Sequence, residues 1–356
     1  MRVLVTGLGT FWGSQLAQRL EARPDVEVIV GVDTTEPRLP LERTEFVRAD
    51  SSYSILQRIV RATRVDTVLH AHLAVDSTSM GRRALHELNV IGTMNLLAAV
   101  SAPGSHVRKM VVKGSTMVYG SSSKDPSFFR EDMERIHSPR TGVERSMVEV
   151  ESFVRDFAED NPRVDVTTLR FANVLGGDVE SPLMRALRMR FTPQVFGFDP
   201  RLQFVHETDV VNALLHATIH RVAGIFNVAG DGCLPWSEAC AIVGRMRFPL
   251  PPYFTQLAAD GLRLFGAPLP PEVLTLLKYG RVVDNTAYKR AGFEYAFTTA
   301  GAIDAFARGL RLEHAVGTAA PSYRYERDVE TFFRHSPAVV RPWGGTAPEG
   351  PEPADT

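Results

Sequence analysis

The sequence predicts an α/β protein: a Rossmann-type, doubly wound parallel sheet with a smaller, irregular C-terminal substrate domain. Two observations support this fold class. Apolar strands alternate with helical segments through the first half of the chain, and a glycine-rich turn joins the first strand to the first helix. From about residue 176 the alternation weakens, and proline and glycine become more frequent.

Short apolar segments rich in β-branched residues predict the strands. Helical segments separate most of them, so the strands are expected to run parallel through right-handed crossovers. In chain order they are RVLVTG (2–7), VEVIVGVD (26–33), TEFVRAD (44–50), VDTVLHA (65–71), VRKMVVKGS (107–115), VDVTTLRF (164–171) and AGIFNVAG (223–230).

Apolar residues at helical spacing predict the intervening helices. Trp12, Leu16 and Leu20 mark the first helix, and the segment 82–100 reads as one long helix. In 142–160, one face of the predicted helix carries Val143, Met147, Val150, Val154 and Phe157.

These elements predict a domain division. The Rossmann domain is expected to take most of the first half, and the C-terminal end has nothing to bury. The expected parts are a Rossmann domain at 1–175 with 204–229 returning to it, a substrate region at 176–203 and 230–312, an extension at 313–341 and a disordered tail at 342–356.

Composition excludes several classes of function. With 356 residues, 44% of them hydrophobic, the chain can bury a large core, and a net charge of −1 gives no reason to expect nucleic acid or a membrane surface as a partner. Cys233 and Cys240 alone cannot build a disulfide framework or a zinc site, so no metal is expected. We find no signal sequence and no apolar run near 20 residues, which favours a cytoplasmic location.

The stretch VTGLGTFWGS (5–14) is a candidate phosphate-binding turn. Glycine lets a backbone approach a phosphate closely, and a helix N-terminus offers free N–H groups. Gly7 and Gly13 fit this role, but Thr10 stands where a middle glycine is usual. Asp33, at the end of the second strand, could accept from a ribose hydroxyl, which favours NAD over NADP. A plain strand–turn–helix connection is the alternative.

Several stretches in this order resemble the extended short-chain dehydrogenase/reductase family, the NAD-dependent epimerases and dehydratases of nucleotide sugars. They are VTGLGTFWGS, RAD (48–50), VLHAHLA (68–74), LNVIGTMNLL (88–97), GSTMVYGSS (114–122) and LRFANVLG (169–176), and the likeness is greatest to a bacterial UDP-glucose 4-epimerase-like subgroup.

The resemblance implies NAD as cofactor, a nucleotide sugar as substrate and a homodimer as an option. It matches Ser115 to the catalytic Ser/Thr and Asn89 to a structural asparagine. The cofactor residues that it implies are Gly7, Thr10, Phe11, Trp12, Gly13, Asp33, Asp50, Ser51, His70, Ala71 and Arg145, and the substrate residues are Asn173, Arg201 and Arg281.

The family's catalytic Tyr and Lys, spaced Y-x-x-x-K, are missing. Aligning the helix 142–160 on Glu149 places Thr141 and Arg145 at these positions, and aligning it on Pro139 instead places Arg140 and Glu144 there. Neither register gives Tyr or Lys, and residues 125–252 contain no Tyr and no Lys at all. Threonine does not ionise near neutral pH, and arginine stays protonated. Arg145 could still bind a cofactor ribose; equally, it could form a helical ion pair with Glu149.

Lys113 is the candidate replacement acid/base. It lies two residues before Ser115, at the end of the fifth predicted strand, where burial would lower its pKa. The alternative is a lysine whose ammonium simply reaches solvent from a strand end.

Two functions therefore stay open: an NAD-dependent epimerase/dehydratase with a displaced acid/base, and an inactive NAD-binding sensor or scaffold. An NADP-linked reductase is disfavoured by Asp33.

Overall fold

The structure is a computed structural model that describes residues 1–253 and 269–316. The chain divides into two units, residues 1–308 and 309–356, and the fold given below is that of the first unit. From residue 317 onward, the predicted extension and the predicted tail lie outside the described residues.

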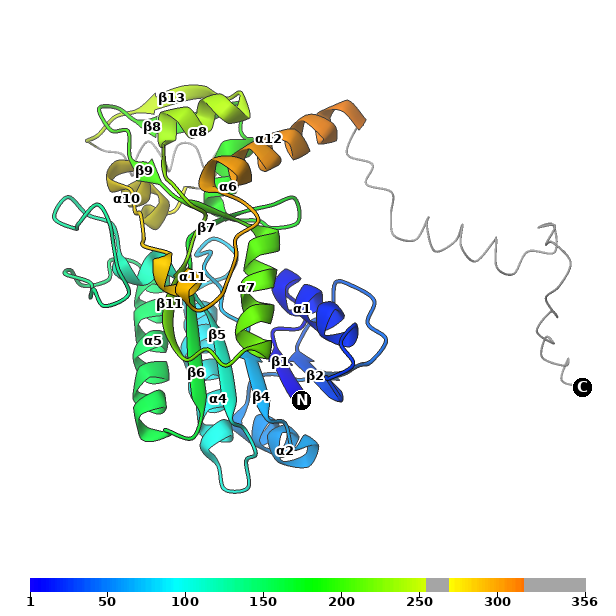
Figure 1. Ribbon diagram of the computed structural model, residues 1–356. Helices are drawn as coiled ribbons and strands as arrows, with labels where there is room; N and C mark the ends of the chain where they lie inside the picture. The colour runs from blue at the N-terminus through cyan, green and yellow to red at the C-terminus, as the bar shows by residue number, and fades with distance from the viewer. Residues whose placement is uncertain (254–268, 317–356) are drawn as a thin grey trace, which may run out of the picture. The chain divides into compact units, whose positions relative to one another are not determined.

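A seven-stranded parallel sheet forms the centre of the first unit (Figure 1). Its strand order is β11-β6-β5-β4-β1-β2-β3, so the predicted fold class is confirmed. The strands are β1 (Arg2–Thr6), β2 (Val28–Asp33), β3 (Thr44–Arg48), β4 (Thr67–His70), β5 (Lys109–Ser115), β6 (Asp165–Phe171) and β11 (Gly224–Val228).

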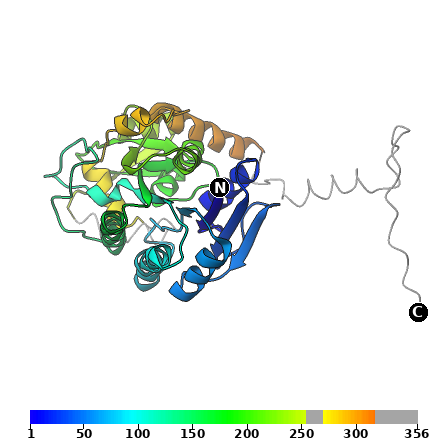
Figure 2. The same cartoon turned by 60° about the horizontal axis from the view of Figure 1, so that its bottom comes forward.

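Helices cover both faces of the sheet, which Figure 2 shows from the lower end of the strands. One core cluster joins the sheet to α2 (Tyr53–Thr63), α4 (Gly92–Ser101) and α5 (Gly142–Asp160). The other joins it to α1 (Phe11–Glu21) and α7 (Glu207–Ile219). Side chains alternate along a strand, so Met110 and Val112 of β5 enter the first cluster and Val111 the second.

The predicted long helix 82–100 is interrupted by a π-helical turn. The segment consists of α3 (Arg82–His86), the π-helical turn η1 (Glu87–Ile91) and α4. Within the turn, the Asn89 amide accepts from Ala74 N and donates to Ala74 O, both at 2.8 Å. This tertiary contact holds the loop after β4 on the helix. A π turn of this kind often marks a functional site, and no local sequence signal announces it.

Short sheets and helices follow in the second half of the unit. The paired strands are β7 (Asn173–Leu175) with β10 (Phe204–His206), β8 (Phe191–Val195) with β13 (Met246–Leu250), and β9 (Arg201–Leu202) with β12 (Leu234–Pro235). The helices there are α6 (Pro182–Arg188), α8 (Trp236–Val243), α10 (Pro271–Tyr279) and α11 (Thr286–Arg290), and α12 (Thr299–Val316) begins in this unit. The short helix η2 (Thr116–Tyr119) comes earlier, directly after β5.

The strand order places a topological switch at β1. From β1 the chain runs outward to β2 and β3 on one side, and β4, β5, β6 and β11 fill the other. In such sheets a ligand binds outside the carboxyl ends of the strands at the switch. β7, β8, α6 and α10 lie beyond these carboxyl ends in Figure 1, where a substrate region is expected.

Candidate functional site

Thr10 closes the turn between β1 and α1. Its hydroxyl donates to the Gly7 carbonyl at 2.7 Å and accepts from the Gly13 amide at 3.1 Å. Gly7 has a φ of +79°, and a Cβ there would lie 2.8 Å from the His72 backbone. A Cβ at Gly13 would lie 2.1 Å from the Gly7 oxygen. The backbone therefore requires glycine at both positions, while Thr10 serves as the helix N-cap.

Two backbone amides at the start of α1 are free to donate a hydrogen bond to a ligand. In the part of the chain that the structure describes, the N–H groups of Phe11 and Trp12 have no hydrogen-bond acceptor. They point from a helix end that carries a partial positive charge. This arrangement fits one phosphate group of a dinucleotide.

Asp33 lies at the end of β2, as predicted, but its carboxylate is already held by the protein. One oxygen accepts from the Thr35 amide (3.0 Å) and hydroxyl (3.1 Å), and the other from the Gly9 amide (3.0 Å). His72 Nε2 lies 4.0 Å from that second oxygen. The residue is 3% exposed, so a ribose hydroxyl would have to replace the Thr35 contacts.

A cavity of about 580 Å³ opens at the carboxyl ends of the strands. Its walls come from α1, the loop after β4, the end of β5, β7, α6 and α10. Of the residues singled out in the sequence, it brings together Thr10, Trp12, Lys113, Ser115, Asn173 and Arg281.

Lys113 is a buried cation in this cavity. It is 4% exposed, and its Nζ lies 5.3 Å from the centre of the Trp12 ring. Among the described residues, no group accepts a hydrogen bond from this ammonium, and no carboxylate forms an ion pair with it. Burial lowers the pKa of Lys113 to about 8. The buried side chain does not reach solvent from the strand end, and a role as acid/base stays a prediction.

Ser115 follows Lys113 on the same face of β5 and lines the same cavity. Its hydroxyl oxygen accepts from the Met117 amide at 3.2 Å as the N-cap of η2. This contact fixes the oxygen and leaves the hydroxyl proton available as a donor.

The structure corrects the role proposed for Arg145. Its side chain is exposed and lines a separate surface depression with Arg82, His86 and Glu149. The buried apolar stripe of α5, which includes Val143, fixes the rotation of the helix, and Arg145 falls on the solvent side.

Thr141 also lacks an acid/base role. Its hydroxyl accepts from the Glu144 amide at 3.3 Å, and the Glu144 side chain completes the capping box. The residue of this turn that lines the main cavity is Glu144, whose carboxylate accepts from Arg135 at 2.8 Å.

Of the eleven predicted cofactor residues, Thr10 and Trp12 line the cavity, and His70, Ala71, Asp50 and Ser51 are among those that do not. The buried His70 ring contacts the hydroxyls of Thr6 (2.7 Å) and Thr93 (2.9 Å), and burial lowers its pKa to about 3. These contacts correct the expected cofactor role of the His70 side chain. Ala71 is buried. Asp50 is exposed, and its carboxylate accepts a hydrogen bond from the Ser52 amide. The Ser51 carbonyl accepts a hydrogen bond from the Asn95 side chain.

At the substrate end, Arg281 and Asn173 line the cavity as predicted, and Arg201 does not. Arg281 donates to the Gly120 carbonyl at 3.2 Å, but its buried Nε has no partner among the described residues. Burial lowers the pKa of Arg281 to about 10. The exposed Arg201 instead pairs through its backbone with β12.

Sequence reasoning missed Glu272 and Arg185. Glu272 accepts from Ser77, its other oxygen is buried without a partner among the described residues, and burial raises its pKa. Arg185 donates to Asp76 at 3.0 Å and to Thr78 at 2.6 Å. Neither belongs to a motif; the fold alone brings them to the cavity.

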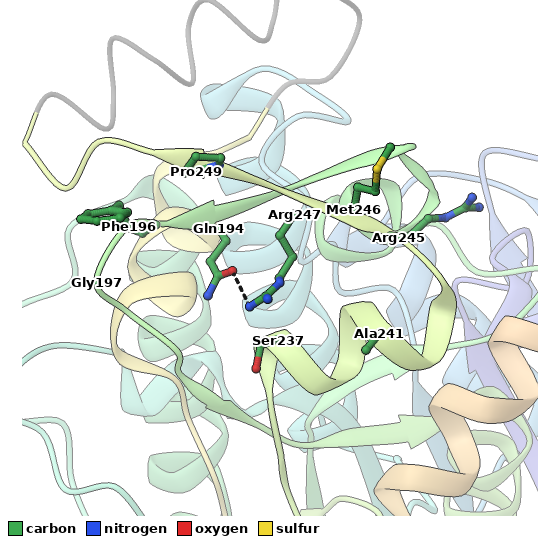
Figure 3. A pocket seen from close by; sticks show the side chains of 10 residues that line it. Gln194, Phe196, Gly197, Ser237, Ala241, Arg245, Met246, Arg247 and Pro249 are labelled. Carbon is green, nitrogen blue, oxygen red and sulfur yellow. Dashed lines mark hydrogen bonds between the residues drawn. The ribbon is translucent and has the colours of Figure 1, made fainter.

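A second depression, of about 700 Å³, lies between the β8–β13 sheet and α8 (Figure 3). Arg247 donates across it to Gln194 at 3.2 Å. Its lining offers no carboxylate, His or Cys, so the cavity at the strand ends is the better candidate site.

The described residues contain no cluster of three or more His, Cys, Asp or Glu side chains suited to a metal ion. No described helix is both long and apolar enough to cross a membrane.

Comparisons with known proteins identify the family. The NAD dependent epimerase/dehydratase family matches residues 3–229. An uncharacterised protein of Mycobacterium tuberculosis is 38% identical over 318 residues, which cover 87% of this chain and 84% of that protein. UDP-glucose 4-epimerase of Erwinia amylovora is 28% identical over 187 residues, 49% of this chain and 54% of that enzyme.

Solved structures show the same fold. UDP-glucose 4-epimerase of Thermotoga maritima, with UDP-glucose, gives a TM-score of 0.65 at 20% identity, covering 88% of this chain and 100% of that one. dTDP-glucose 4,6-dehydratase of Streptomyces venezuelae, with NAD, gives 0.67 at 21% identity, covering 89% and 98%. The chain therefore belongs to the NAD-dependent epimerase/dehydratase family.

Proposed function

We propose that this protein is an NAD-dependent enzyme of the UDP-sugar 4-epimerase type, in which Lys113 and Ser115 replace the absent Tyr/Lys pair. The observation that carries the proposal is the buried, unpaired Lys113 ammonium, which shares one cavity with Ser115 and with the open end of α1. A lysine in this state is unusual unless it has a task, because burying an unpaired charge is unfavourable.

The turn residues fit the cofactor of the family. The Phe11 and Trp12 amides would hold the diphosphate, and the Trp12 ring would form a wall of the site. Bound NAD would supply a hydride acceptor that later returns the hydride to the sugar.

Lys113 would act as the base. With a pKa of about 8, about a tenth of its side chains are neutral at pH 7. A neutral amine can take the proton of a sugar hydroxyl as that carbon is oxidised and give it back on reduction. Ser115 would donate to the same substrate oxygen and so position it.

Polar groups at the far end of the cavity suit a nucleotide sugar. The free Nε of Arg281 is a donor for a phosphate oxygen, and the Asn173 side chain lies in the same wall. The unpartnered Glu272 oxygen is an acceptor for a sugar hydroxyl.

The test is turnover of UDP-glucose and UDP-galactose by the NAD-loaded protein, followed by chromatography of the products. Lys113→Ala should reduce the rate by about a hundredfold or more, since general acid–base groups contribute about 10²–10⁴-fold. Lys109→Ala is the matched control, because Lys109 lies on the same strand and bonds the Thr218 carbonyl outside the cavity. Equal rates for Lys113→Ala and wild type would refute the mechanism.

A second candidate function is an NAD-binding sensor or scaffold without catalysis. The observation in its favour is that α5 contributes no ionisable acid/base pair to the cavity, only Glu144. Deuterium exchange between a labelled sugar nucleotide and bound NAD separates the two candidates: any transfer excludes the sensor, and none with tight NAD binding supports it.

A homodimer also remains a proposal. Ile91 and Met94, on η1 and α4, are 42% and 43% exposed, and apolar side chains on neighbouring helical turns favour a partner surface. Light scattering of the purified protein would show whether it associates.

A further inference from the structure

We propose that Lys113 makes the cofactor site discriminate between the two charge states of its cofactor, so that the protein binds NADH more tightly than NAD⁺. The inference rests on the proposed function, because it concerns the same site. It adds a property of the ground state that can be measured without substrate.

The strand order indicates where the nicotinamide half of the cofactor would lie. The diphosphate is expected at the free amides of α1, directly after β1. Asp33, the residue suited to the adenosine ribose, ends β2 on one side of β1. A dinucleotide that crosses the switch point therefore extends its other half over the ends of β4 and β5. Lys113 lies at the end of β5, on this second side.

Trp12 connects the ammonium with the cofactor site. Its backbone amide is one of the two free groups at the start of α1, and its ring lies under the Lys113 Nζ at 5.3 Å. Both side chains line the same cavity. A ligand on that amide which extends toward β5 would enter the cavity that the ammonium lines.

Among the described residues, no carboxylate forms an ion pair with Lys113, although Glu144, Glu272 and Arg281 line the same cavity. Burial is the one cause that lowers its pKa, without a contribution from a nearby charge. On the adjacent strand, Lys113 pairs with Leu169. At the end of β4, burial lowers the pKa of His70 and of His72, which keeps both rings neutral at pH 7.

The two carboxylates at the start of α7, which packs on the same face of the sheet as Lys113, are bound to backbone amides. Glu207 accepts from the amides of Gly177 and Asp178, and Asp209 from those of Ala296 and Phe297. Burial lowers the pKa of His206, so this ring adds no positive charge at pH 7.

The two cofactor forms differ in one charge near this lysine. Their diphosphates are identical, so attraction between Lys113 and the diphosphate favours both forms equally. The nicotinamide ring is positive in NAD⁺ and neutral in NADH, so only NAD⁺ suffers repulsion from the ammonium. Two unit charges a few ångströms apart at an effective dielectric constant near 20 repel by a few kcal/mol. Because Lys113, with a pKa of about 8, can release its proton instead, the ratio of the dissociation constants at pH 7 is expected to be on the order of tenfold.

The same coupling would serve the reaction. Binding of NAD⁺ favours the neutral amine, which is the form that can accept a proton. A bound cofactor would supply the hydride acceptor. Neutral Lys113 would accept the hydroxyl proton of the sugar and become an ammonium, which is the charge state compatible with an uncharged nicotinamide.

The experiment is titration calorimetry of NAD⁺ and of NADH, at pH 7.0 and at about pH 9.5, on the full-length protein. Lys113→Met removes the charge at similar side-chain length. Lys109→Met is the control, a lysine on the same strand and face that bonds the carbonyls of Thr218 and His220. We expect wild type and Lys109→Met to bind NADH about tenfold more tightly than NAD⁺ at pH 7.0, and Lys113→Met to lose this preference.

The pH arm needs no variant, so it tests the inference even if Lys113→Met does not fold. The wild-type preference should decrease as pH rises through about 8, where Lys113 loses its proton. A ratio near one in wild type at pH 7.0, or the same ratio in Lys113→Met, would overturn the inference and leave the proposed function standing. Failure of wild type to bind either form would overturn both.

Discussion

Replacing Lys113 with methionine should stabilise this protein. A functional group that is unfavourable for folding is expected at an active site, and its removal then raises stability while activity falls. Lys113 meets this condition, since it is 4% exposed and, among the described residues, has no hydrogen-bond or ion-pair partner. Methionine fills similar volume without a charge.

The magnitude follows from the pKa shift. Burial lowers the pKa of Lys113 from 10.5 to about 8, and each unit corresponds to about 1.4 kcal/mol, so the protonated side chain destabilises the fold by about 3 kcal/mol at pH 7. Above pH 8 the folded state releases this proton while the unfolded chain still binds it. The lysine penalty therefore decreases as pH rises from about 8 to 10.5.

The assay is urea denaturation of wild type, Lys113→Met and Lys109→Met at several pH values. We expect Lys113→Met to raise the unfolding free energy at pH 7 by about 2–3 kcal/mol, with the difference shrinking toward pH 10. Lys109→Met should destabilise, because it removes a hydrogen bond to the Thr218 carbonyl. A loss of stability in Lys113→Met, or a gain independent of pH, would refute the account of Lys113 as a buried, unpaired cation.

Three further predictions concern other parts of the site and core. Gly13→Ala should abolish NAD binding and destabilise by about 1–3 kcal/mol, because its Cβ would meet backbone; calorimetry and thermal melts check this. Arg170→Met should destabilise by about 3–5 kcal/mol, because it leaves the buried Glu151 carboxylate with Arg155 at 4.0 Å as its ion-pair partner, and adding Glu151→Leu should recover most of the loss in urea titrations. The double change Thr141→Tyr with Arg145→Lys should not raise turnover of UDP-glucose, because position 145 lies outside the cavity; a clear gain would show that α5 rotates into the site.

Much of the fold could be predicted because the signals are local. All seven strands of the sheet coincide with predicted segments, since each is a short β-branched run between turns or helices. The π turn at 87–91 was not predictable, because it depends on the contact between Asn89 and the loop after β4.

The error over Arg145 has a specific physical cause. The alignment took Glu149 as the glutamate that follows the Tyr/Lys pair in the family. In the structure Glu151 is the buried one, paired with Arg170 of β6 (3.0 Å), and Glu149 lies at the surface near His86. A helix turns by about 100° per residue, so an alignment that is shifted by two residues assigns the family's positions to the opposite face of the helix.

Lys113 could be proposed from sequence because its place at a strand end implies the cavity. Glu272 and Arg185 could not, because α10 and α6 reach the cavity only through tertiary packing of the irregular second half.

The central claim is that the free amides of Phe11 and Trp12 bind the cofactor diphosphate. Titration calorimetry of NAD⁺ and NADH into the wild-type protein tests it most directly. The account predicts saturable binding with one cofactor per chain, which Gly13→Ala removes. No association of either form at millimolar concentration, with the protein folded, would contradict it.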